Sequence, residues 1–177
     1  MPEYEFTLKF KLPNFNTNPE IYIDKLYESG CDDALIGVGT KGYIALNFIR
    51  ESDSAYEAIK SAMENVKSVI PGVELVEALP DWVGVTDIAN LLGCTRQNIQ
   101  KLILKDNSSC PSAIHSGAQS IWHLAEFLTW LSEDKNYEIE ESLLETAKIT
   151  MNLNLAKEYK KLAPDLHESF KSLVTST

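Results

Sequence analysis

Residues 85–104, with the sequence VTDIANLLGCTRQNIQKLIL, decide how the middle of this chain folds. Apolar residues recur at helical spacing on both sides of one glycine: Ile88, Leu91 and Leu92 come before Gly93, and Ile99 and Leu102 come after it. Each set makes an apolar stripe along one side of a short helix. Glycine adopts a left-handed backbone without steric cost, so Gly93 is suited to end the first helix. The stretch therefore predicts a helix, a tight turn and a second helix whose apolar sides face each other.

Four small or polar residues fit this arrangement. Thr86 and Thr95 each stand at the start of an apolar-periodic segment, where a hydroxyl oxygen can accept a backbone N–H of the first helical turn. We therefore expect both threonines to be N-caps. Ala89 leaves room for two crossing helices to approach closely, and Cys94 is an apolar residue that fills the turn.

The second helix carries a polar side opposite its apolar stripe. Arginine makes paired hydrogen bonds to guanine and glutamine does so to adenine, whereas threonine and lysine suit phosphate groups. The pattern predicts that Arg96 and Gln100 contact bases. We expect the positioning and phosphate contacts to come from the other polar residues of this side and from the lysine that follows, namely Thr95, Gln97, Lys101 and Lys105.

This stretch resembles the helix-turn-helix motif of DNA-binding regulators. The small residue at Ala89, the glycine at Gly93 and the apolar residues of both helices fall where that family has them, without a gap. The resemblance implies that the second helix enters the major groove of DNA. The alternative is a helical hairpin that only packs against the rest of the protein.

A polar connector and a predicted β-hairpin follow this motif. Residues 112–115 and 119–122 flank Ser116-Gly117, and a helix with its apolar residues between Leu124 and Leu131 comes next. Trp122 and Trp130 are expected to anchor the core. Residues 82–132 as a whole resemble the winged-helix domains of MerR-like and AlpA-like regulators. The resemblance implies that the hairpin touches the adjoining DNA backbone or minor groove through His115, Ser116 and Gln119.

Residues 1–80 show a different pattern. Alternating apolar residues predict a strand over 4–12, and further strands are expected over 34–38, 43–49 and 73–79, with helices over 20–29 and 53–70. The resulting order, β-α-β-β-α-β, resembles the ferredoxin-like fold, so we expect an α+β protein. Pro80 marks the boundary between a domain of residues 1–80 and the winged-helix domain of residues 81–132.

The C-terminal segment, residues 133–177, is predicted to be helical. Apolar residues recur every three to four positions between Ile139 and Leu162 and predict a long helix over 137–162, followed by a short amphipathic helix around Phe170. In MerR-like proteins such a helix pairs with its mate, so the resemblance implies a homodimer through this segment. The alternative is that the long helix packs on its own chain.

Charge and cysteine content narrow the function further. The chain of 177 residues has a net charge of −10, which argues against a protein that coats nucleic acid without specificity. Residues 81–131 contain three basic residues, and all of them lie on or just after the second helix: Arg96, Lys101 and Lys105. The three widely spaced cysteines suit reduced thiols in the cytoplasm. No apolar run approaches the length of a membrane span, and no signal peptide is expected.

Two patterns resemble sites of chemistry but have simpler explanations. Gly37-Val38-Gly39-Thr40-Lys41-Gly42 has the glycine spacing of a dinucleotide-binding loop, yet a strand follows it instead of a helix, so we expect a hairpin turn. A metal site could be drawn from the cysteines and histidines of the middle segment, but short ligand pairs are missing, and both histidines are expected at the surface. The residues concerned are Cys94, Cys110, His115 and His123. Asp32-Asp33 is expected to form a turn.

The sequence therefore predicts a sequence-specific, double-stranded DNA-binding protein of prokaryotic or phage type that regulates transcription. We expect no catalytic activity, no cofactor and no bound metal. Two alternatives stay open: an excisionase-like or architectural DNA-binding factor, and an enzyme with an accessory DNA-binding domain. The N-terminal domain is a candidate site for a small-molecule or protein effector.

Overall fold

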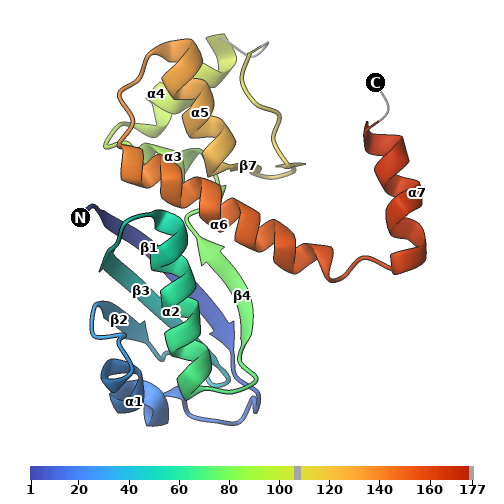
Figure 1. Ribbon diagram of the computed structural model, residues 1–177. Coiled ribbons are helices and arrows are strands. Elements are labelled where there is room, and N and C mark those ends of the chain that lie inside the picture. Colours follow the sequence, from blue (N-terminus) through green and yellow to red (C-terminus); the bar gives the residue numbers. More distant parts are fainter. Residues whose placement is uncertain (106–108, 176–177) are drawn as a thin grey trace.

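The computed structural model describes residues 1–105 and 109–175 and has a mixed α+β fold with two antiparallel sheets (Figure 1). The N-terminal unit, residues 1–80, contains β1 (Glu3–Lys11), η1 (Pro19–Tyr22), α1 (Ile23–Glu28), β2 (Ala34–Gly37), β3 (Tyr43–Glu51), α2 (Ala55–Val69) and β4 (Glu74–Leu79). The middle unit, residues 82–135, contains β5 (Trp82–Val83), α3 (Val85–Leu91), α4 (Arg96–Lys105), β6 (His115–Ser116), β7 (Ser120–His123) and α5 (Leu124–Lys135). The chain continues with α6 (Glu141–Tyr159) and α7 (Pro164–Thr175).

The N-terminal unit is a four-stranded antiparallel sheet with the strand order β2-β3-β1-β4. Its order of strands and helices along the chain is the predicted one, with the short η1 added before α1. Alternate residues of β1 are buried, and Phe6 of this strand stacks on Phe48 of β3 with ring centroids 5.1 Å apart. The buried side of α2 packs on the same core through Ala58, Ile59 and Ala62.

Arg50 is the buried charge of the N-terminal unit. Its guanidinium donates to both carboxylate oxygens of Asp33, at 2.6 and 2.9 Å, and to the backbone oxygen of Gly30 at 2.6 Å. Its remaining N–H groups reach Ser61 and Asn65 of α2, so every N–H of the guanidinium has an acceptor. Asp33 lies in the predicted turn and, in addition, links this turn to α2 through Arg50, a contact that the turn prediction did not include.

The middle unit confirms the helix, turn and helix expected for residues 85–104. Gly93 has a φ of +63°, and Thr95 caps α4, because its hydroxyl oxygen accepts the N–H of Asn98 at 3.2 Å. The expected cap at Thr86 is wrong. Helix α3 begins two residues earlier than such a cap implies, at Val85, with Gly84 as its N-cap, and the carboxylate of Asp87 accepts the Gly84 N–H at 2.8 Å.

The predicted hairpin is present and belongs to a three-stranded sheet with the order β5-β7-β6. Its first strand is shorter than the expected 112–115 and lies further along the chain: β6 is His115–Ser116, so Ser116, which was expected in the turn, pairs with Ser120. The two-residue strand β5 was not predicted. It pairs Trp82 with His123 and thereby joins the start of the middle unit to the base of the hairpin.

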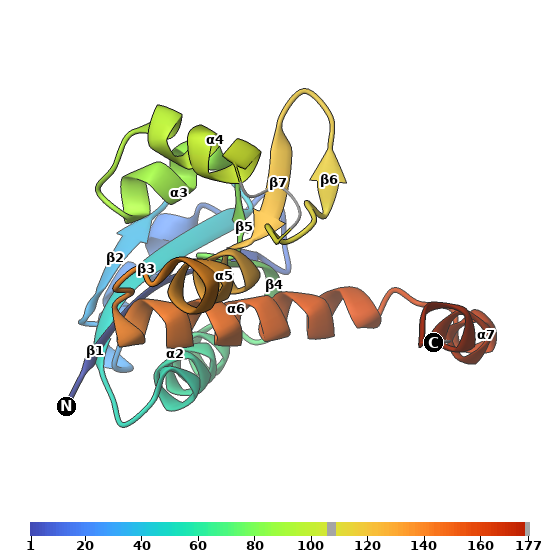
Figure 2. The ribbon, with the colours of Figure 1, turned by 90° about the horizontal axis from the view of Figure 1, so that it is seen from above.

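Helix α6 packs against both units of its own chain and runs beside α5, β4 and α2 (Figures 1 and 2). Ile149 and Leu153 pack on the core of the N-terminal unit, whereas Leu144 and Met151 pack on the core of the middle unit. The interpretation that this helix needs a second copy to bury its apolar residues is therefore wrong, and the alternative of packing on its own chain holds. Homodimerisation itself stays a prediction.

A buried polar cluster lies where α6 meets the two sheets. The side-chain amide of Asn154 donates to the backbone oxygen of Ala78 and to the carboxylate of Asp81, both at 2.8 Å, and its oxygen accepts the Ala78 N–H at 2.9 Å. The other oxygen of Asp81 lies 2.7 Å from Nδ1 of His123. Thr150 donates to the backbone oxygen of Pro80 at 2.6 Å. The cluster connects β4, β7 and α6 by hydrogen bonds.

The outer edge of β4 is also closed by α6. Asn154 occupies both backbone groups of Ala78, and the ammonium of Lys157 donates to the backbone oxygen of Val76. An open strand edge is a template for pairing with another chain, and these side chains remove it.

Among the described residues, no helix is both long and apolar enough to cross a membrane.

Replacing Asn154 tests how much the buried cluster stabilises the fold. Asn154→Ala leaves three buried groups without partners: the N–H and C=O of Ala78 and one Asp81 oxygen. Each such group costs about 1–3 kcal/mol, so we expect the free energy of unfolding to fall by about 3 kcal/mol or more. Asn152→Ala is the matched control, because Asn152 is exposed on the same helix. Urea denaturation measures both variants, and an equal loss in the two would contradict this role of the cluster.

Candidate nucleic-acid interface

Helix α4 places its predicted polar residues at the surface. Ile99 is buried, Leu102 is partly buried, and both face the core of the middle unit as expected. The side chains of the five polar residues of this helix predicted to meet DNA are all exposed: Arg96, Gln97, Gln100, Lys101 and Lys105. The amphipathic pattern predicted from the sequence is therefore correct for this helix.

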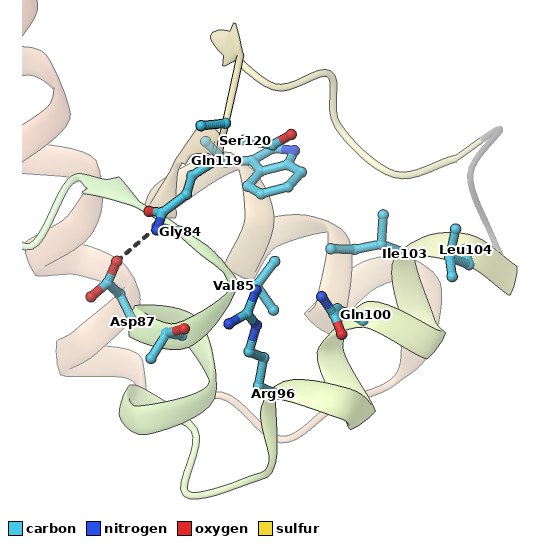
Figure 3. A pocket seen from close by; sticks show the side chains of 12 residues that line it. Gly84, Val85, Asp87, Arg96, Gln100, Ile103, Leu104, Gln119 and Ser120 are labelled. Carbon is cyan, nitrogen blue, oxygen red and sulfur yellow. Dashed lines mark hydrogen bonds between the residues drawn. The ribbon is translucent and has the colours of Figure 1, made fainter.

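Two of these residues line a cleft between α4 and the hairpin (Figure 3). Arg96 and Gln100 lie one turn apart on α4, and Gln119 lines the same cleft from the segment between β6 and β7, with its side chain ending near Gly84 and Asp87. The cleft has a volume of about 440 Å³. Its apolar lining includes Val85 and Trp122. The fold thus brings together three predicted DNA contacts from two separate segments of the sequence.

The polar side chains of the cleft are available to a ligand. Arg96, Gln100 and Gln119 make no side-chain hydrogen bond or ion pair with any residue in the described ranges 1–105 and 109–175. Asp87, the carboxylate of the cleft, accepts the Gly84 N–H, and no ion pair between it and Arg96 is present in this part of the chain. The guanidinium of Arg96 therefore keeps its donors for an acceptor from outside, such as a base edge or a phosphate.

Leu104 is a residue of this surface that the sequence did not single out. Its side chain is 78% exposed and lines the cleft, although leucine is expected inside. It follows Gln100 by four residues, as Gln100 follows Arg96, so the three side chains lie along one side of α4. That spacing is the signal from which it could have been found. An apolar side chain in this position suits the methyl group of thymine.

The other predicted DNA contacts lie outside the cleft. Gln97 and Lys101 are exposed elsewhere on α4, and Lys105 is its last residue. His115 and Ser116 are exposed on β6 and do not line the cleft. Thr95 accepts the Asn98 N–H as a helix cap, so its hydroxyl oxygen has a structural role whether or not its proton is donated to a phosphate.

Two tryptophans fix the base of the hairpin and the connector before it. Trp122 donates from its indole nitrogen to the backbone oxygen of Pro111, and Trp130 donates to the hydroxyl of Ser109, both at 3.0 Å. Phe127 lies between the two rings in edge contacts with both. Both tryptophans are buried, which confirms them as core anchors. They hold the connector that leads into β6 against α5 and β7.

The candidate metal ligands do not converge. His123 was expected at the surface, but it is buried and its Nδ1 lies 2.7 Å from Asp81, because β5 pairs with the end of β7. Burial raises the pKa of the Cys110 thiol, which disfavours the thiolate that a metal needs. Within residues 1–105 and 109–175, no group of three histidine, cysteine or acidic side chains could hold a metal ion.

Replacing Gly93 tests the turn that sets the angle between α3 and α4. No described atom would lie within 4 Å of a Cβ at this position, so Gly93→Ala adds only the strain of a left-handed backbone. That strain is about 1–2 kcal/mol, and we expect the thermal unfolding temperature and the free energy of unfolding to fall accordingly. Gly39→Ala is the control, because Gly39 has open space and no positive φ. A Gly93→Ala variant as stable as this control would contradict the turn geometry.

Comparison with known proteins found no relative of this chain. No family model, no curated protein and no solved structure matches this chain. The case for a function consequently depends on the geometry and chemistry of the cleft and of the exposed side of α4.

Proposed function

We propose that residues 82–132 form a winged helix-turn-helix domain of the MerR-like and AlpA-like kind, and that this domain binds specific sites on double-stranded DNA. The observation that supports the proposal most is the row of Arg96, Gln100 and Leu104 on one exposed side of α4, with Gln119 of the hairpin lining the same cleft (Figure 3). A helix of this size fits the major groove, and the first turns of such a helix meet the base edges.

Each residue of this row matches a different feature of a base pair. The planar fork of Arg96 suits the two acceptors of guanine, and the amide of Gln100 suits the donor and acceptor of adenine. Leu104 suits a thymine methyl group. Lys101 and Lys105, which lie off this row, supply point charges for phosphates on either side of the groove. Gln119, with His115 and Ser116 behind it, reaches the adjoining backbone or minor groove.

The charge of the protein favours specific over nonspecific binding. The chain has a net charge of −10, and three of the four basic residues of the middle unit lie on α4. Phosphate contacts provide most of the affinity in nonspecific complexes, and that part falls steeply with salt. With few cations available, the base contacts of α4 have to supply a larger share of the binding free energy.

The remaining parts of the protein fit a regulator of transcription in a prokaryotic cell or phage, without an enzymatic step. The order and pairing of the strands in the N-terminal unit support a ferredoxin-like domain, which would serve as a platform for an effector or a partner. The thiols of Cys31, Cys94 and Cys110 are free, which suits the reducing cytoplasm.

Selection of binding sites from random duplex DNA tests this proposal. We expect one enriched motif, and we expect Arg96→Ala to weaken binding to it by about 1–3 kcal/mol and to relax the preference at one base pair. The variant should stay folded, because Arg96 is exposed. Titration by fluorescence anisotropy measures the loss. The proposal is wrong if no motif is enriched, or if Arg96→Ala binds the selected site as the unaltered protein does.

Lys101→Ala separates phosphate contacts from base contacts. Because Lys101 lies off the row that meets the bases, we expect its loss to weaken binding to all sequences alike and to reduce the slope of log K against log salt by about one. Lys25→Ala is the matched control, since Lys25 is an exposed lysine on α1, far from α4 (Figure 1). A change in sequence preference with Lys101→Ala, or an equal effect of both variants, would count against the assignment.

A further inference from the structure

Helix α7 exposes an apolar side to solvent. Leu166, Phe170, Leu173 and Val174 are 51%, 51%, 70% and 82% exposed, and no residue of this helix is buried in the described part of the chain. In both views α7 stands beyond the end of α6, away from the two units (Figures 1 and 2). Isolated helices of about 12 residues are marginal in water, and most helical stability comes from packing of the apolar side. This helix therefore needs a surface to pack on.

The start of α7 is fixed to the end of α6. The hydroxyl of Tyr159 lies 2.9 Å from Nε2 of His167, and the two rings make an edge contact with centroids 4.7 Å apart. This contact directs α7 away from the body of its own chain. The apolar side that begins at Leu166 is consequently presented to another molecule.

A groove of matching character lies between α2 and α6. Two adjoining hollows of about 410 and 620 Å³ share Met63, Lys67 and Leu153 and together extend from Tyr56 to the outer edge of β4. We call this surface the α2/α6 groove; its floor is apolar and includes Ile59, Met63, Ile149 and Leu153. Its walls carry more lysines than acidic residues: Lys60, Lys67 and Lys160 are examples of the lysines, and Glu64 and Glu74 are the acidic residues.

The groove and α7 agree in length and charge. Helix α7 has 12 residues, and the part of α2 that lines the groove runs from Tyr56 to Lys67, so both are roughly 18 Å long. The first half of α7 carries Asp165 and Glu168. The end of the groove beside the last turns of α6 is bordered by Lys67, Lys157, Lys160 and Lys161, and by Glu74. Lys157 and Lys161 already pair with Glu158, so Lys67 and Lys160 are the lysines of this end that the charge match depends on. Long lysine side chains can follow the flank of a docked helix and reach carboxylates on its polar side.

We propose that α7 of one copy of this chain binds in the α2/α6 groove of a second copy. Each copy has both a groove and a projecting α7, so the exchange is reciprocal and closes at two copies around a two-fold axis. We name a second copy as the occupant because α7 and the groove agree in length and charge and belong to the same chain. The contact between Tyr159 and His167 holds α7 away from the two units of its own chain. The dimer does not depend on the proposed DNA binding. Where both hold, it brings two α4 helices to one DNA site.

Light scattering on the full chain tests the exchange. We expect a mass of twice 19.8 kDa for the unaltered protein. The double variant Leu166→Ser with Phe170→Ser should be a monomer that still unfolds in a cooperative thermal transition, because both side chains are exposed in the single chain. Lys171→Ser, on the polar side of the same helix, is the control and should remain a dimer. A monomeric unaltered protein, or a double variant that remains a dimer, overturns the proposal.

A photo-reactive phenylalanine analogue in place of Phe170 identifies the occupant. We expect cross-linked products of twice the chain mass whose joined peptides pair α7 with residues 56–67 or 149–161. Cross-links within a single chain would show α7 folded back on its own groove and would overturn the exchange. Cross-links between two α7 helices would overturn the groove as the docking site. DNA is absent from both experiments, so their outcome is separate from that of the site selection.

Discussion

The fold depends on one buried side chain, Asn154, because its amide satisfies backbone and carboxylate groups that have no access to water. Its oxygen and nitrogen occupy both backbone groups of Ala78 in β4, and the same nitrogen holds Asp81, which in turn holds His123 at the end of β7. Buried polar groups without partners cost free energy, so none of these contacts is dispensable alone. The two sheets are therefore fixed to each other through α6, and the hairpin that borders the cleft is built on one of them.

The same helix explains why the C-terminal segment divides into two parts with different roles. Along its first turns, Glu145 accepts the N–H of Ala55 at the start of α2 and the hydroxyl of Tyr4 in β1, both at 2.9 Å. With Ile149 and Leu153 packed on the same unit, α6 is an integral third helix of the N-terminal layer. The two most exposed large apolar side chains of the C-terminal helices, Leu173 and Val174, lie after its end, on α7. The dimer contact that we propose therefore lies on the short helix and not on the long one.

Local patterns in the sequence correctly predicted the elements whose structure depends on neighbouring residues alone. The alternation in β1, the stripe of Ile99 and Leu102 and the glycine turn each depend on neighbours within a few residues. The contact between Asp81 and His123 joins residues 42 positions apart, and the contact between Asp81 and Asn154 joins residues 73 apart. No periodicity encodes such pairs. In the candidate site, exposure of Arg96 and Gln100 was predictable, whereas Leu104 was missed because leucine is normally assigned to the core.

Helix α6 shows that apolar periodicity alone does not reveal what a helix packs against. Its apolar residues do recur every three to four positions, and this correctly predicted a helix, but they face two separate cores on different sides of the helix. A helix that buries several sides looks in sequence much like one that offers a stripe to a partner, and only the tertiary fold separates the two cases. The short α7 is the opposite case, because its apolar residues lie on one side and are exposed. If the proposed dimer and DNA binding both hold, an acidic protein with few cations on its DNA-binding surface gains from such a helix, since two linked α4 helices add their base contacts on one DNA site.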